Sequence, residues 1–169
     1  MNGSKDLKTI IYFKGVYDTL DLFTDHLIEA FESMGYGTFV YHTANEEVSK
    51  KMLLRLLGES QEFAAVTFNN LGYNLSFEQP EAAEGEEGKP EEYNIWDYFH
   101  IPYIDILMDH PFHYEKPLCN MPKTAVILCT DRNHVKYIRR FFKNIHQTDF
   151  LPHAGVELGH KHKPLNDRN

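Results

Sequence analysis

Two residues that could carry acid–base chemistry, Asp109 and His110, directly follow a short apolar run at 103–108. Because this run is short and is bounded by Pro102 and Pro111, it predicts a buried strand rather than a helix. In open α/β sheets, ligands bind outside the carboxyl ends of the strands. We therefore predict Asp109 and His110 as catalytic residues. The alternative is that Asp109 only caps the loop and His110 only packs against it.

Other predicted strands end in residues that could bind a polar ligand at the same edge of the sheet. The predicted substrate-binding set comprises Gly15, Val16, Asn69, Asn70, Asp131, His134 and His153. Asp131 and His134 lie where a helix begins, so free N–H groups would point into the same rim. The alternatives are that Asp131 is only an N-cap, that His134 faces solvent and that His153 is a structural loop residue.

The elements that must position these residues alternate between strands and helices. We predict strands at 8–13, 37–41, 63–68, 103–108, 124–129 and 148–151, helical segments at 20–34, 45–57, 95–99 and 131–145, and a loop at 111–122. This alternation is typical of right-handed crossovers. The predicted fold class is α/β, a Rossmann-like three-layer sandwich with a mainly parallel sheet of about six strands. Because the first strand is followed by Gly15 alone, without G-x-G-x-x-G, we expect no NAD-type site.

The charge of the chain is concentrated in one segment. The chain has 169 residues, enough for one domain, and a formal net charge of -8. Residues 78–92 contain seven acidic residues and one lysine, which gives -6 and leaves about -2 for the rest. This composition predicts a disordered acidic insertion at 78–92. Because the rest of the chain carries a net charge of about -2 and no basic excess, it does not favour a nucleic-acid surface.

The remaining composition predicts a protein of the cytoplasm. Cys119 and Cys129 are the two cysteines and form no CxxC motif, so we expect free thiols. No apolar run of about 18 residues occurs, so we expect no membrane span. The metal-capable residues show no compact zinc spacing, so we expect no metal site.

Three segments occur in a telling order, namely Asp109-His110-Pro111, Leu128-Cys129-Thr130-Asp131-Arg132-Asn133-His134-Val135-Lys136-Tyr137 and Phe150-Leu151-Pro152-His153-Ala154-Gly155. Together they resemble the N-terminal half of a bacterial glycosyltransferase-like family related to the spore-maturation protein CgeB, over roughly residues 8–157. The resemblance implies a GT-B architecture, in which two Rossmann-like domains face each other across a cleft. In such enzymes the C-terminal domain makes most of the nucleotide-sugar contacts, and the N-terminal domain shapes the acceptor side.

The resemblance sets the expected organisation and function. Residues 1–157 would be the acceptor-side domain, and 158–169 a polar tail or a linker to a C-terminal nucleotide-sugar-binding domain. The expected partners are a sugar or glycan acceptor and that second domain. The expected donor of the intact enzyme is a nucleotide sugar, with no cofactor in this domain and no turnover by this chain alone. In an inverting enzyme His110 would be the general base with the largest effect on rate. The alternative is a non-catalytic α/β domain that binds a small ligand or has a regulatory role.

Overall fold

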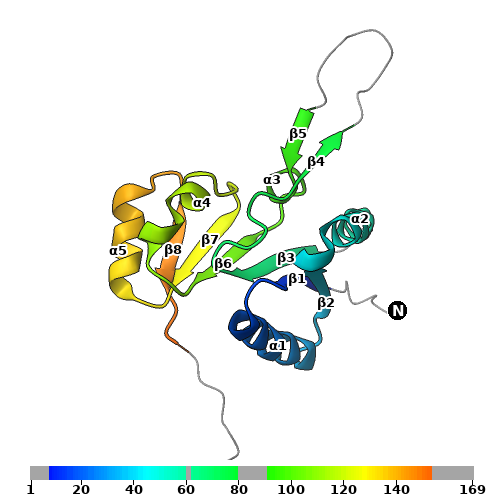
Figure 1. Cartoon of the computed structure of the whole chain (residues 1–169), viewed down its shortest axis with the longest axis horizontal. Coiled ribbons are helices and arrows are strands. Elements are labelled where there is room, and N and C mark those ends of the chain that lie inside the picture. The colour runs from blue at the N-terminus through cyan, green and yellow to red at the C-terminus, as the bar shows by residue number, and fades with distance from the viewer. Residues whose placement is uncertain (1–7, 60–61, 80–90, 154–169) are drawn as a thin grey trace, which may run out of the picture.

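A computed structural model describes residues 8–59, 62–79 and 91–153 of the protein. Its main sheet has six strands in the order β2-β1-β3-β6-β7-β8, and every neighbouring pair is parallel (Figure 1). The strands are β1 (Lys8–Lys14), β2 (Gly37–His42), β3 (Glu62–Phe68), β6 (Tyr103–Leu107), β7 (Ala125–Cys129) and β8 (Gln147–Phe150). The predicted fold class, an α/β Rossmann-like sandwich with a mainly parallel six-stranded sheet, is confirmed.

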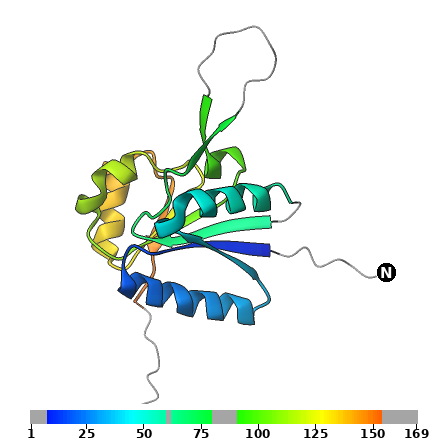
Figure 2. The same ribbon diagram turned by 45° about the vertical axis from the view of Figure 1, so that its right-hand side comes forward.

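The helices lie unevenly on the two faces of this sheet. The α-helices are α1 (Asp18–Ser33), α2 (Glu46–Leu57), α3 (Ile95–Tyr98), α4 (Glu115–Cys119) and α5 (Arg132–Phe141), with 3-10 turns η1 (Thr43–Asn45) and η2 (Pro111–Tyr114). The chain crosses the sheet in one direction from β1 to β2 and in the opposite direction from β2 onward. Right-handed crossovers therefore place α1 on one face and the later helices on the other. Figures 1 and 2 show α1 and α2 on opposite sides of the sheet.

Two apolar clusters follow from this arrangement. The larger cluster lies under α2, α3, α4 and α5 and contains the fully buried Trp96, Leu53 and Ile138. The smaller cluster lies under α1 and joins Ile10 and Tyr12 of β1 to residues on the inner side of that helix. Because strands of a parallel sheet are covered on both faces, β1 consists of a continuous apolar run rather than an alternating one.

The structure corrects the predicted disorder at the ends of the acidic insertion. Residues 76–79 and 91–94 form an antiparallel pair, β4 (Ser76–Gln79) and β5 (Glu91–Asn94), which projects from the body in Figure 1. The pair forms because Phe77 stacks against Tyr93, Tyr98 and Phe99, with ring centroids 6.1, 4.9 and 5.8 Å apart. The acidic composition of the segment predicted disorder, because it gave no sign of these aromatic contacts of Phe77. Residues 80–90 lie outside the described residues.

Two further predictions were wrong in detail. The loop predicted at 111–122 contains η2 and α4, which the apolar pattern was too short to reveal. The last helix ends at Phe141 rather than continuing to Ile145, because Phe142 leaves the helical conformation at ψ 83°. The predicted domain end at 157 and the polar tail at 158–169 lie outside the described residues. In the described ranges, no helix has the length and apolar character needed to cross a membrane.

Gly72 offers a test of the packing between the 69–75 segment and β1. Its φ is +76°, and a Cβ at this position would lie 2.3 Å from Cε1 and Cζ of the buried Phe13 ring. Gly35 also has a positive φ, +89°, but nothing lies within 4 Å of its Cβ position. We therefore expect Gly72→Ala to lower the free energy of unfolding by about 2–4 kcal/mol and Gly35→Ala by about 1–2 kcal/mol. Urea denaturation followed by circular dichroism measures both, and equal losses would contradict the packing.

Candidate functional site

The carboxyl ends of the six parallel strands meet at one edge of the sheet, as predicted. This places Gly15, Asn69, Asp109 and Asp131 along a single rim. The first crossover runs from β1 to β2 on one side of β1, and the second runs from β2 to β3 on the other side of β1. Ligands of open α/β sheets bind at such a switch point. The rim next to it, between β3 and β6, carries the densest group of polar side chains.

Asn69 joins the ends of β3 and β6. Asn69 and Asn70 both adopt the left-handed conformation, with φ of 49° and 65°, which Asn tolerates better than most residues. The turn brings the Asn69 side chain across to the neighbouring strand. There Oδ1 accepts the Met108 N–H at 2.9 Å, and Nδ2 donates to Asp109 Oδ2 at 2.9 Å. The amide of Asn69 thus fixes the position of the Asp109 carboxylate.

Asp109 has one oxygen engaged by the protein and one facing outward. Oδ2 accepts a second hydrogen bond, from the Tyr114 hydroxyl at 3.0 Å. Burial, and then the carboxylate itself, raise the pKa of that hydroxyl above its usual range, so it remains a donor. Within the described part of the chain no group donates to Oδ1. An exposed carboxylate oxygen held in this way is suited to accept a hydrogen bond from a ligand hydroxyl.

His110 is held by a backbone hydrogen bond at the start of η2. Its Nδ1 accepts the Phe112 N–H at 3.1 Å, so the neutral ring carries its proton on Nε2 and presents a donor there. The ring lies against His134 and Tyr137, with centroids 4.7 and 5.1 Å apart. His110 and Asp109 therefore offer a donor and an acceptor side by side.

His134 comes from the first turn of α5. Asp131 caps this helix, since its Oδ1 accepts the Asn133 N–H at 2.6 Å. Nδ1 of His134 is buried and has no partner among the described residues. Burial, and secondarily the neighbouring His110, lower the pKa of the His134 ring below its usual value of 6.5. The ring is therefore neutral at physiological pH and keeps a lone pair.

The structure brings together only part of the predicted set. Asn69, Asp109, His110 and His134 form one group, which we call the rim cluster. The exposed Asp131 acts as the helix cap, and Asn70 is 4% exposed, beneath the rim rather than on it. His153 lies elsewhere, in a groove beside α1.

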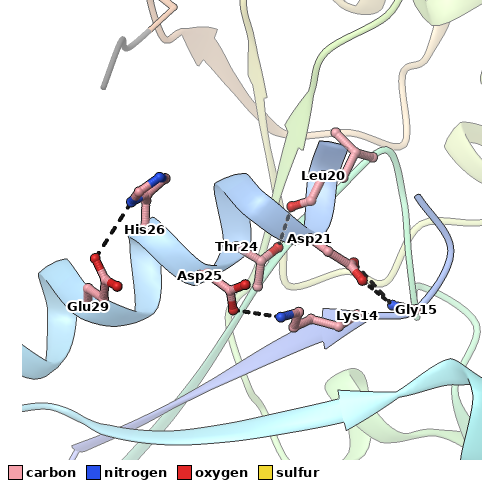
Figure 3. Close-up of polar contacts among 8 residues, drawn as sticks. All are labelled: Lys14, Gly15, Leu20, Asp21, Thr24, Asp25, His26 and Glu29. Atoms are coloured by element: carbon pink, nitrogen blue, oxygen red, sulfur yellow. Dashed lines mark hydrogen bonds and ion pairs between the residues drawn. The ribbon is translucent and has the colours of Figure 1, made fainter. Parts of the chain in front are cut away.

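The β1–α1 turn contributes less than its position suggests. The Gly15 N–H donates to both carboxylate oxygens of Asp21, at 3.1 and 3.0 Å, and Lys14 Nζ bonds Asp25 at 2.6 Å (Figure 3). The Gly15 amide is therefore already occupied by the first turn of α1. Val16 is 44% exposed and is free to contact a ligand.

The sequence analysis missed three residues around the rim cluster. Tyr114 and Tyr137 contact its members, and no spacing signal distinguishes them from core aromatics. Asp105 could have been found, because it is the one charged residue within the apolar run at 103–108. It is fully buried, its Oδ1 accepts the Asn70 N–H at 2.8 Å, and its Oδ2 has no partner among the described residues.

Neither a metal site among the described residues nor a similar known protein indicates the function of the rim cluster. Among the described residues, no three His, Cys, Asp or Glu side chains lie close enough to hold a metal ion. Comparisons of the chain with protein-family models, curated proteins and solved structures gave no match. The interpretation of the site therefore depends on its own geometry.

Asp105 predicts how stability changes with pH. Burial raises the pKa of its carboxyl from 3.8 to about 7. Because the folded-state pKa lies above the unfolded one, the folded protein holds the extra proton between these values. The stability contributed by this group is therefore present at low pH and is lost as the pH rises from about 4 to about 7.

We expect Asp105→Asn to remove this loss. Relative to the wild type, its free energy of unfolding should improve by roughly 2–4 kcal/mol between about pH 4 and about pH 8. Urea denaturation at both pH values measures the change. Asp149→Asn, an exposed change of the same type in β8, is the control and should show little difference. Parallel behaviour of the two variants would mean that Asp105 is not desolvated.

Proposed function

We propose that this chain is the acceptor-side domain of a glycosyltransferase with a GT-B architecture. The observation that carries the proposal is the rim cluster, in which the Asp109 carboxylate lies beside the His110 and His134 imidazoles at the carboxyl ends of parallel strands. Such groups hydrogen-bond the hydroxyls of a sugar or glycan acceptor. The family resemblance of the segments around Asp109, Asp131 and His153 points the same way.

The proposed reaction assigns a task to each group of the rim cluster. In glycosyl transfer an acceptor hydroxyl oxygen bonds to the anomeric carbon of the donor sugar, and the bond from that carbon to the nucleotide breaks. The hydroxyl proton passes to a base. In this proposal Asp109, whose Oδ2 is fixed by Asn69 and Tyr114, takes this proton, and the neutral His134 is a second candidate acceptor. The general-base role of His110 stays a prediction, since its hydrogen bond to Phe112 favours donation from Nε2.

The donor side of the reaction belongs to another domain in this proposal. A nucleotide sugar would be bound mainly by a C-terminal domain, and this chain would hold no cofactor. The engaged Gly15 amide agrees with this division, because it leaves the first crossover without a free donor at that position for a phosphate. The two cysteines, Cys119 and Cys129, are free thiols, in keeping with a cytoplasmic location.

The rim cluster also favours a second candidate, a non-catalytic domain that binds a small polar ligand or regulates a partner. A domain whose polar groups bind ligand hydroxyls can recognise a ligand without transferring a sugar to it. Both candidates require recognition at the rim cluster, and they differ in whether a nucleotide-sugar-binding domain acts with it.

A glycan array probed with the labelled chain tests the proposal. We expect binding to a restricted group of glycans, weakened about tenfold or more by Asp109→Asn and by His110→Ala, because each removes a hydrogen bond to a ligand hydroxyl. His146→Ala is the matched control, since His146 is exposed and lies before β8, at the opposite edge of the sheet. Circular dichroism verifies folding. The proposal is wrong if no glycan binds, or if both rim variants bind as the wild type does.

A further inference from the structure

A groove on the α1 face of the sheet has no role in the function proposed above. Its volume is about 460 Å³, and its apolar lining comprises Phe23, Leu27, Phe68, Ile106, Met108 and Leu151. It forms because α1 covers the face near β1 and β3, whereas the described chain places no helix over β6 and β7 on this side. The segment that follows β8 forms its second wall.

The size and chemistry of the groove fit a small neutral ligand. Its volume lies in the range of small-molecule sites, roughly 300–1,000 Å³. None of the described residues that line it is Asp, Glu, Lys or Arg. Its polar groups are Thr130 and the two histidines, His26 and His153. In Figure 3 His26 pairs with Glu29 on α1. A charged ligand would find no Asp, Glu, Lys or Arg among the described lining residues, whereas an apolar ring or chain would be desolvated.

The groove extends to the carboxyl ends of β3 and β6, the edge of the sheet at which the rim cluster lies. Phe68 and Met108 line it, and the next residues in the chain, Asn69 and Asp109, belong to the cluster. Thr130, which directly follows β7, also lines the groove, and its hydroxyl donates to the Met108 carbonyl at 3.4 Å. A ligand seated in the groove therefore lies on the α1 face at the carboxyl ends of β3 and β6, and its upper end has to pass over the edge of the sheet to meet the rim cluster.

We propose that this groove binds the apolar part of the acceptor, an aromatic ring or short alkyl chain, and that a hydroxyl attached to it lies at the rim cluster. This inference rests on the proposed function for the identity of the ligand as an acceptor. The groove itself stands on its volume, its largely apolar lining and its position at the carboxyl ends of the strands. The acceptor class that it selects is a glycoside or alcohol with an apolar group, rather than a fully polar saccharide.

The first experiment tests the groove without any sugar. The probe is 1-hexanol, titrated into the 169-residue chain while methyl signals are followed by NMR. We expect saturable shifts of the Leu27, Ile106 and Met108 methyl groups. Ala30→Phe, which places a ring in the groove from α1, should weaken this binding at least fivefold. Ser33→Phe, an exposed change on the same helix outside the groove, should leave it unchanged.

Two results of this titration would overturn the proposal. One is the absence of saturable shifts at the groove methyl groups. The other is a dependence of those signals on protein concentration alone, with a doubled mass in light scattering, because the occupant would then be a second copy of the chain. A loss of hexanol binding in Ser33→Phe as well as in Ala30→Phe would also count against the groove, since only one of the two side chains lies in it.

The second experiment separates the groove from the proposed function. Hexyl β-glucoside and methyl β-glucoside are compared for affinity and for shifts at His110 and His134. We expect hexyl glucoside to bind at least tenfold more tightly, with the gain lost in Ala30→Phe and both histidine rings shifted. Groove shifts without histidine shifts would support the groove and contradict the sugar site. Equal affinities, with histidine shifts from both glucosides, would support the sugar site and overturn the groove.

Discussion

The turn at Asn69 and Asn70 is the constraint on which the site depends. Two consecutive residues in the left-handed conformation turn the chain sharply at the end of β3, and hydrogen bonds to β6 and to the two residues after it hold it there. Asn69 uses both ends of its side-chain amide, on Met108 and Asp109, and the backbone of Asn70 bonds the buried Asp105. These bonds, together with that of the Tyr114 hydroxyl, fix the position of Asp109 relative to the end of β3.

This constraint leaves buried polar groups incompletely paired. Asp105 Oδ2 and both side-chain polar atoms of Asn70 have no partner in the described part of the chain. Buried polar atoms in folded proteins are almost always hydrogen-bonded, and an unpaired one costs about 1–3 kcal/mol. Strain of this kind is typically kept at functional sites. Its location directly beneath Asn69 and Asp109 fits a site in which stability is given up for a fixed geometry.

The uneven cover of the two sheet faces by helices also shapes the surface near the candidate site. The four later helices cover one face, whereas among the described residues α1 is the one helix on the other, so β6 and β7 keep a partly buried apolar surface there. The polar rim and the apolar groove are thus produced by one topology. A ligand with a hydroxyl and an apolar group would use both.

Much of the fold was predictable from the sequence, because periodicity and proline or glycine boundaries mark β1, α1 and β6 clearly. The short helices after Pro111 were missed, since five residues are too few for a periodic signal. The hairpin of β4 and β5 was missed because its stability comes from Phe77 stacking on residues that lie far along the chain.

The candidate site was predictable in outline and not in detail. The prediction that Asn69 and Asp109 lie at one edge of the sheet is confirmed, because parallel strands share an edge. The alternative that Asp131 is a helix cap is the one that the structure shows. The sequence could not show that Asn70 turns inward or that His153 lines the groove beside α1. Each of these depends on the direction of a side chain, which a single residue type does not determine.

The central claim is that strand ends far apart in the sequence bring His110 and His134 into one partly desolvated site. The NMR pH titration of the His134 ring carbons tests this most directly. We expect the pKa of His134 to lie below the ordinary value of 6.5 and to rise in His110→Ala, because burial and the neighbouring imidazole both lower it. A His134 pKa at or above 6.5 that is unchanged in His110→Ala would contradict the account.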